Sequence, residues 1–304
     1  MTSERAASSQ WHHRYAGLVA SATFLLLIAV GLVTSTGSGL SVPDWPLSFG
    51  QVFPRMAGGV LFEHGHRMVA TVVGLLTLVL AVWTARAEPR AAVRRLGWLL
   101  LGVVILQGVL GGTTVLLRLP SAVSVAHAAL AQVFFALTVL MFAVTSPAFP
   151  EQGAAGPDSG TPSARTLSLA LVIAVYVQIL VGAVVRHIGA GLAIPDFPLS
   201  YGRIVPAFTS SLITWQYAHR VLAVLVAALL AWTAVAVLAR FPGRSVLVRP
   251  AAALLVLVVL QILLGGVTIW SRRGVLPTTA HVATGALLFI TAVLLAVRAR
   301  RTLT

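Results

Sequence analysis

Long apolar stretches recur eight times along this chain, and they constrain its fold more than any other feature. They cover approximately residues 15–34, 64–86, 95–117, 122–146, 166–186, 213–239, 250–270 and 278–297. A helix needs about 20 mostly apolar residues to cross the hydrocarbon core of a bilayer. Only 9% of the residues are charged, which is too few for a surface covered by water. The sequence therefore predicts an all-α membrane protein with eight transmembrane helices.

The charged residues are strongly biased toward arginine. The chain has 21 basic residues other than histidine against 7 acidic ones, a formal net charge of +14, and no lysine. The arginines fall between the apolar stretches, as topology-setting charges do, and they form no basic face for nucleic acid. Thirteen lie on the side that would include the N-terminus and eight on the other. We therefore expect a multi-pass protein with both termini in the cytoplasm and no nucleic-acid partner.

The two halves of the chain repeat the same features in the same order. Residues 37–50 match residues 189–202 at an offset of 152, and residues 107–114 match residues 261–268 at an offset of 154. Four apolar stretches follow one another in the same order in each half, so the repeat is parallel and not inverted. The sequence predicts two pseudo-symmetric four-helix bundles in a parallel tandem repeat.

A segment rich in Pro, Gly, Ser and Ala separates the two halves. It covers residues 147–165 and has the composition of a flexible linker, which the topology puts in the cytoplasm. We expect residues 1–146 to form the N-terminal bundle and residues 166–304 to form the C-terminal bundle. The chain contains no cysteine, which excludes disulfides, thiolate metal sites and thiol catalysis.

Four histidines are the main candidates for a functional site. His66, His127, His219 and His281 open the second, fourth, sixth and eighth apolar stretches, all near the outer side of the expected topology. Ionisable side chains inside a membrane are costly and mark functional sites. Two histidines at one depth in each bundle are suited to bind one haem iron from both sides. Zinc fits less well, because no further His or Cys shares that depth in either half.

The two halves differ in chemistry three residues before the first histidine of each pair. Glu63 precedes His66 in the first half, and Gln216 precedes His219 in the second. Residues three apart share a helix face, and a carboxylate can accept a proton where an amide cannot. We infer that the first half reacts and the second half carries electrons. The alternative is that Glu63 is an exposed, interfacial acid favoured by the helix dipole.

Several other repeated residues have both a functional and a structural interpretation. Arg67 and Arg220 could contact haem propionates or extend to the membrane interface. The glycine pairs at 111–112 and 265–266 could admit a flat macrocycle, although tight packing between helices is favoured. Gln107 and Gln261 are expected to bridge helices.

The loops between the apolar stretches and one further histidine have structural interpretations. The Pro-Asp-aromatic-Pro loops at Asp44 and Asp196 are expected to form turns that cover the outer end of each bundle. His64 lies two residues before His66, points to another side of the helix, and is expected at the membrane interface.

These features together resemble the haem A synthase family. The resemblance extends from Trp11 to about Arg298 and includes all four histidines. The segments that carry it are GSGLSVPDWP, FEHGHR, QGVLGG and GAGLAIPDFP.

The resemblance implies an oxidoreductase that converts the C8 methyl group of haem O to a formyl group by successive hydroxylations. The product, haem A, would supply terminal oxidases. In such an enzyme His66 and His127 would bind the substrate haem, with Glu63 as the catalytic acid or base. His219 and His281 would be the axial ligands of a haem b cofactor. The implied environment is a bacterial cell membrane, with haem O synthase and oxidase assembly factors as possible protein partners and an electron acceptor that the sequence does not identify.

The chain departs from one common version of the family pattern. Many members carry a cysteine pair in the outer loops, and here those places hold Val42 and Ser48 in the first loop and Ile194 and Ser200 in the second. A loop disulfide or a thiol step is therefore impossible, while the histidines and Glu63 remain.

Two other classes of function are compatible with part of the pattern. A bis-histidine membrane cytochrome b would pass electrons from quinol without modifying haem, but it gives no reason for the difference between Glu63 and Gln216. A transporter built from a parallel repeat would have helices broken by proline near the midplane. The apolar stretches here have no central proline.

Overall fold

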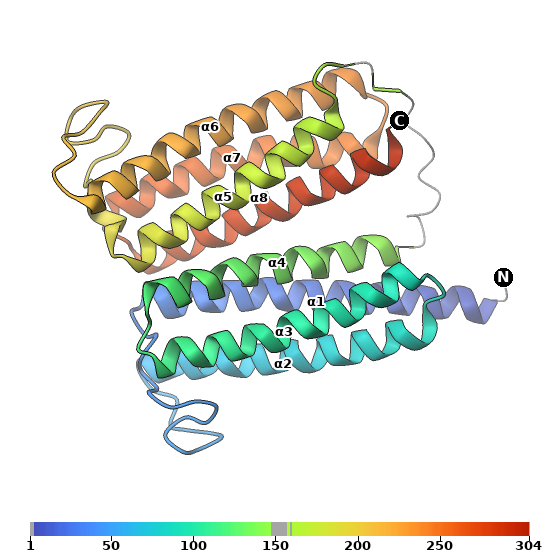
Figure 1. Ribbon diagram of the computed structural model, residues 1–304, viewed down its shortest axis with the longest axis horizontal. Coiled ribbons are helices and arrows are strands. Elements are labelled where there is room, and N and C mark those ends of the chain that lie inside the picture. The colour runs from blue at the N-terminus through green and yellow to red at the C-terminus, as the bar shows by residue number, and fades with distance from the viewer. Residues whose placement is uncertain (1–2, 147–156, 159, 304) are drawn as a thin grey trace. The chain divides into compact units, whose positions relative to one another are not determined.

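The computed structural model describes residues 3–146, 157–158 and 160–303, with side chains from residue 10 onward (Figure 1). The described residues form α1 (Ser3–Ser35), α2 (Gly59–Ala87), α3 (Ala91–Leu116), α4 (Ser121–Thr145), α5 (Ala164–His187), the short 3-10 helix η1 (Ala190–Leu192), α6 (Ser211–Arg240), α7 (Ser245–Trp270) and α8 (Val275–Thr302). Each of the eight α-helices is long and apolar enough to cross a membrane, with the candidate span of α1 beginning at Gln10. The predicted all-α fold with eight transmembrane helices is confirmed.

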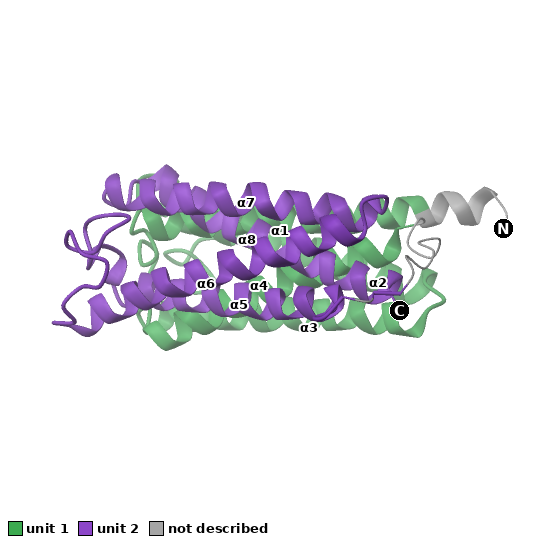
Figure 2. Ribbon diagram, turned by 90° about the horizontal axis from the view of Figure 1, so that it is seen from above, with its two compact units in different colours: residues 1–151 green, residues 152–304 purple. Residues whose placement is uncertain are grey.

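The chain divides into two compact units, residues 1–151 and residues 152–304 (Figure 2). The division falls inside the segment 147–165 that composition marks as a linker. Residues 147–156 and 159 of that segment lie outside the described residues. We describe each unit by itself below, as unit 1 and unit 2.

Each unit is a bundle of four helices with the same neighbour relations. In unit 1, α1 and α3 each pack against both α2 and α4. In unit 2, α5 and α7 each pack against both α6 and α8. The even-numbered helices therefore occupy diagonally opposite corners of each bundle. Two side chains that point inward from them face each other across the bundle core.

The apolar core of unit 1 fills the part of the bundle away from the histidines. On α2, α3 and α4 its buried members are pairs seven residues apart: Val73 and Leu80, Val93 and Leu100, and Phe134 and Met141. On α1 they are Ala16 and Val19. Val73 follows His66 by seven residues and Phe134 follows His127 by seven, about two helical turns in each case. The histidine layer thus lies between this core and the loop end of the bundle.

α2 begins five residues before the predicted start at residue 64. The chain enters it through Gly58, whose φ of 56° favours glycine. A Cβ atom on Gly59 would lie 2.0 Å from the Ser41 hydroxyl oxygen, so the close approach of this loop also requires glycine. The prediction that His66 opens the helix is therefore wrong, and His66 lies about two turns inside α2.

α7 begins at Ser245, although the sequence places its start at Pro250. Proline has no N–H group to donate to the carbonyl four residues earlier, which here belongs to Val246. The guanidinium of Arg298 on α8 donates to that carbonyl oxygen at 3.0 Å. A side chain from the neighbouring helix thus supplies the missing hydrogen bond and lets α7 continue through the proline.

Candidate functional site

The four histidines lie on the even-numbered helices, at the end of each bundle where the long loops connect. His66 on α2 and His127 on α4 lie near enough for their rings to interact electrostatically, and so do His219 on α6 and His281 on α8. Because each pair comes from diagonally opposite helices, the two imidazoles approach from opposite sides of the bundle core. This is the geometry in which two nitrogens can bind one metal ion from opposite faces of a flat ring.

Glycines on the odd-numbered helices make room for three of these imidazoles. A Cβ atom would lie 3.1 Å from Cε1 of His127 at Gly111, 3.0 Å from Cε1 of His219 at Gly182, and 3.3 Å from Cε1 of His281 at Gly265. Any side chain at these positions would displace the histidine ring.

The second glycine of each pair makes room for a loop. A Cβ atom on Gly112 would lie 2.6 Å from the Trp45 ring, and one on Gly266 would lie 2.9 Å from the Phe197 ring. The nearest neighbours of both glycine pairs are therefore aromatic and imidazole rings. The expectation that these glycines serve helix–helix packing alone is wrong, because the close approach is made by side chains and not by a second helix backbone.

Glutamine side chains on the same odd-numbered helices contact the histidines. Gln107 on α3 donates to the His127 carbonyl oxygen at 3.0 Å, and Gln261 on α7 approaches Nε2 of His281 at 3.4 Å. Both glutamines bridge neighbouring helices, as expected. Gln178 on α5 makes a similar contact that the sequence analysis missed, with its Nε2 3.0 Å from the His219 carbonyl oxygen and 3.2 Å from His219 Nδ1.

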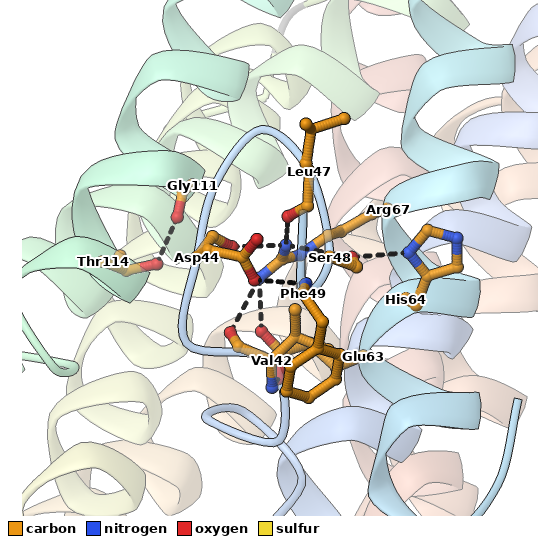
Figure 3. Close-up of polar contacts among 10 residues, drawn as sticks. All are labelled: Val42, Asp44, Leu47, Ser48, Phe49, Glu63, His64, Arg67, Gly111 and Thr114. Atoms are coloured by element: carbon orange, nitrogen blue, oxygen red, sulfur yellow. Dashed lines mark hydrogen bonds and ion pairs between the residues drawn. The ribbon is translucent and has the colours of Figure 1, made fainter. Parts of the chain in front are cut away.

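Glu63 is part of a polar clamp that fastens the first loop to α2 (Figure 3). Its side chain is buried, with the residue only 3% exposed, so the interpretation as an exposed interfacial acid is wrong. Glu63 Oε2 accepts the Val42 N–H at 2.8 Å, and Oε1 pairs with the Arg67 guanidinium at 2.7 Å. Arg67 in turn donates to the carbonyl oxygens of Asp44 at 2.7 Å and Leu47 at 2.9 Å.

Unit 2 contains the same clamp without the negative charge. Gln216 accepts the Ile194 N–H through Oε1, and its Nε2 donates to the Gly191 carbonyl oxygen at 3.0 Å. Arg220 donates to the carbonyl oxygens of Asp196 and Leu199, both at 2.8 Å. An amide therefore satisfies the same loop N–H that a carboxylate satisfies in unit 1.

An aspartate shapes the tip of each loop. Asp44 accepts the N–H groups of Phe49 at 2.7 Å and Gly50 at 2.8 Å. These two hydrogen bonds hold the pKa of the Asp44 carboxyl below its ordinary value. Asp196 does the same in the second loop, where it accepts the N–H groups of residues 201 and 202, and its pKa is lowered in the same way. Both loops are turns held by side-chain acceptors, as their sequence predicts.

Comparison with known proteins identifies the family of this chain. The COX15-CtaA family, described as cytochrome oxidase assembly protein, matches residues 57–293. A protein of Shouchella clausii (strain KSM-K16) named heme A synthase is 32% identical over 251 residues, 81% of this chain and 82% of that protein. Another protein with the same name, from Symbiobacterium thermophilum, is 33% identical over 266 residues, 83% of this chain and 84% of that protein. The chain belongs to the haem A synthase family.

Membership of this family makes the chain an oxidoreductase of haem A biosynthesis and a multi-pass membrane protein. It confirms the resemblance found in the sequence, and it disfavours a cytochrome that only transfers electrons. The assignment of individual residues does not follow from the comparison and depends on the site itself.

The residues of each unit fit a haem. Among the described residues, no three His, Cys, Asp or Glu side chains come together to hold a metal ion. The available nitrogen donors are one facing pair of imidazoles in each unit, which suits an iron already held in a macrocycle and needing two axial ligands. In unit 2, the Gln261 carbonyl oxygen lies 3.2 Å from His281 Nδ1, which favours a proton there and leaves Nε2 to bind metal.

The loop positions that hold cysteine in many family members are buried here and contact α2. Val42 presents its N–H to Glu63, and the Ser48 hydroxyl lies 2.7 Å from Nδ1 of His64. His64 is only 7% exposed and is buried against the loop, while its place at the level of the membrane interface stays a prediction. The serine provides the polar partner that lets this imidazole be buried. No pattern in the sequence indicated this pair, because 16 residues separate its members.

Proposed function

We propose that unit 1 binds haem O between His66 and His127 and oxidises its C8 methyl group, while unit 2 holds a haem b cofactor between His219 and His281. One observation carries the division of roles. The two units share their histidine pair and their loop clamp, but unit 1 has the buried carboxylate of Glu63 where unit 2 has the neutral amide of Gln216. An acid or base is needed where C–H bonds are broken, and it is not needed for electron transfer.

The conversion of the methyl group to a formyl group is a four-electron oxidation. Two successive hydroxylations, each taking its oxygen from water and releasing two electrons and two protons, give a diol on the C8 substituent, and loss of one water from the diol gives the formyl group. A haem b in unit 2 would supply one-electron redox chemistry to carry these electrons toward an external acceptor.

The side chains of unit 1 have separate tasks in this proposal. His66 and His127 fix the substrate by its iron, which sets the position of the C8 methyl group in the bundle. Glu63 lies one helical turn before His66 on the same helix, and it accepts and returns protons at its carboxylate oxygens. The Arg67 guanidinium, 2.7 Å from Oε1, holds this carboxylate in place.

Arg67 and Arg220 stay predicted contacts of the haem propionates, but only some of their N–H groups are available for this contact. In both side chains the two terminal nitrogens already donate to loop carbonyl oxygens. A propionate contact would therefore involve the Nε–H of Arg67, and either the Nε–H or the second Nη1–H of Arg220. Their main proposed role is to hold the loops over the histidine end of each bundle.

We further propose the orientation in a bacterial cell membrane that the arginine distribution predicts, with both termini in the cytoplasm and the histidines toward the outer side. Candidate protein partners are haem O synthase, which would deliver the substrate, and oxidase assembly factors, which would accept the product. We propose no residue of this chain as a binding site for the electron acceptor.

The substitution Glu63→Gln tests this function. Gln216 shows that a glutamine fits the clamp, so the variant should fold. We expect haem A formation from haem O to fall by about 100-fold or more, because a positioned acid–base group contributes about that much. Chromatography of extracted haems should still find haem O and haem b bound. Glu88→Gln, which changes a carboxylate at the opposite end of α2, serves as the control. Normal haem A formation by Glu63→Gln would overturn the role of Glu63, and purified protein without any haem would overturn both histidine sites.

A further inference from the structure

A glutamine and a glycine four residues apart recur on three of the odd-numbered helices. The pairs are Gln107 with Gly111, Gln178 with Gly182, and Gln261 with Gly265. In each case the glycine lies against the Cε1 atom of a histidine on the next helix. The amide nitrogens of Gln107 and Gln261 lie 3.4 Å from Nε2 of that ring, whereas the amide nitrogen of Gln178 lies 3.2 Å from Nδ1. Each glutamine–glycine pair therefore contacts one imidazole ring.

α1 departs from this pattern. Aligning Val30-Gly31 of α1 with Val181-Gly182 of α5 places Leu27 where Gln178 stands. Leu27 is 4% exposed and carries no hydrogen-bonding group. α1 packs against α2, the helix of His66. The buried Nδ1 atom of His66 has no hydrogen-bond partner among the described residues.

In unit 2, by contrast, both histidines have a partner at Nδ1. Gln178 Nε2 lies 3.2 Å from His219 Nδ1, and the Gln261 carbonyl oxygen lies 3.2 Å from His281 Nδ1. Iron binding through Nε2 places a proton on Nδ1, which then needs an acceptor. The Oε1 atom of Gln178 is buried without a partner, and rotation of the amide by half a turn presents it to that proton in exchange for the hydrogen bond from Nε2 to the His219 carbonyl oxygen.

A partner at Nδ1 strengthens a histidine as a metal ligand. It fixes the ring orientation and raises the basicity of the coordinating nitrogen, and its loss weakens metal binding by about 10- to 100-fold. The two units need opposite behaviour under the proposed function. A cofactor must stay bound through many turnovers, whereas a substrate must enter and its product must leave.

We propose that Gln178 is a positioning residue that makes His219 a firm axial ligand, and that Leu27 leaves His66 as the exchangeable ligand through which haem enters and leaves unit 1. This inference rests on the proposed function, because it takes unit 2 as the cofactor site and unit 1 as the substrate site. According to this inference, the two units retain haem differently because α5 has Gln178 where α1 has Leu27.

The reciprocal variants Gln178→Leu and Leu27→Gln test the inference in the full-length protein loaded with haem b and haem O. Transfer of each haem to an excess of haem-free myoglobin gives the two dissociation rates, with chromatography to distinguish the haems. We expect Gln178→Leu to speed the loss of haem b by about 10- to 100-fold, and Leu27→Gln to slow the loss of haem O by a similar factor.

Gln178→Glu provides a second test of Gln178, which does not depend on the folding of Gln178→Leu. Its carboxyl oxygen accepts from Nδ1 more strongly than an amide does, so haem b should stay bound and its midpoint potential should fall below that of the unchanged protein. A midpoint potential of Gln178→Glu equal to or above that of the unchanged protein would overturn the inference even if Gln178→Leu failed to fold. Dissociation rates within about two-fold of the unchanged protein in both reciprocal variants would also overturn it. If the unchanged protein itself retained neither haem, the proposed function would fail instead.

Discussion

The clamps of the two units perform the same structural task with different charges. In unit 1, Glu63 accepts the Val42 N–H and pairs with Arg67, and in unit 2, Gln216 accepts the Ile194 N–H beside Arg220. Burying a carboxylate costs free energy that its ion pair only partly returns, and a neutral group often serves stability equally well. Because unit 2 closes its loop with an amide, the fold does not require a carboxylate in unit 1. The comparison shows that an amide can hold such a loop, and under the proposed function the charge at Glu63 has a chemical role in addition to its contacts with Arg67 and Val42.

The largest expected effects come from removing one histidine in each unit. His66→Leu should abolish retention of haem O while haem b stays bound, and His219→Leu should do the reverse, because each haem loses one of its two axial bonds. Extraction and chromatography of the bound haems, with circular dichroism to confirm folding, measure both variants. If either substitution removed both haems equally from folded protein, the two units would not be independent sites.

Smaller effects are expected where the loops pack on α3 and α7. A Cβ atom on Gly112 would lie 2.6 Å from the Trp45 ring, and one on Gly266 would lie 2.9 Å from the Phe197 ring. Overpacking of this kind lowers the free energy of unfolding by about 1–3 kcal/mol. We therefore expect Gly112→Ala to destabilise the protein in denaturation experiments in detergent, and Gly266→Ala to do so by less.

Gly108→Ala is the matched control for this prediction. Gly108 lies one turn before Gly112 on α3, and a Cβ atom there would have no neighbour within 4 Å. Alanine in a helix is favoured over glycine by about 0.5–1 kcal/mol, so this variant should be neutral or slightly stabilising. Equal stability of Gly108→Ala and Gly112→Ala would show that the Trp45 loop moves aside freely.

The smallest expected effect concerns pH, and here the two units should behave alike. Hydrogen bonds from Phe49 and Gly50 lower the pKa of Asp44 below 3.8, its ordinary value. A carboxyl with a lowered pKa contributes its full stabilisation above the unfolded pKa and loses it as the pH falls through the folded one. The protection of these two amides from hydrogen exchange, relative to an unfolded chain at the same pH, should thus stay high from neutral pH down to about 4 and fall only below the lowered pKa.

The corresponding amides beside Asp196 should follow the same profile, because the same contacts lower its pKa. Asp44→Asn should remove the pH dependence in the first loop only. If the amides of either loop kept their protection from exchange down to pH 2, the aspartate would not hold that turn.

The helices and the pairing of the histidines could be predicted from local sequence. Stretches of about 20 apolar residues have few alternatives to a membrane-spanning helix, since backbone groups in lipid must bond internally. Helix starts were less certain. α2 begins at Gly59, where the Ser41 hydroxyl leaves no room for a side chain, and α7 begins at Ser245, where Arg298 donates to the Val246 carbonyl oxygen. Both partners are distant in sequence from the helix start.

The surroundings of the histidines were only partly predictable. Comparison of the two halves of the sequence singled out Glu63, because a repeat supplies its own reference. The same comparison could have found Gln178, which stands where α1 has Leu27, but the one-residue shift in spacing before the loop hides the match. The burial of His64 against Ser48 left no trace in the sequence, because a hydrogen bond between a loop and a helix has no fixed spacing.

By itself the sequence determined that this chain crosses a membrane eight times, that it consists of two similar halves, and that each half offers two histidines. It did so because apolar length and repetition are properties of the chain alone. Only the tertiary structure decided what the polar groups near the histidines contact. The donors of Arg67 go to loop carbonyls and the glycine pairs accommodate rings, because a buried polar group in an apolar bundle bonds to whichever partner the fold brings within reach.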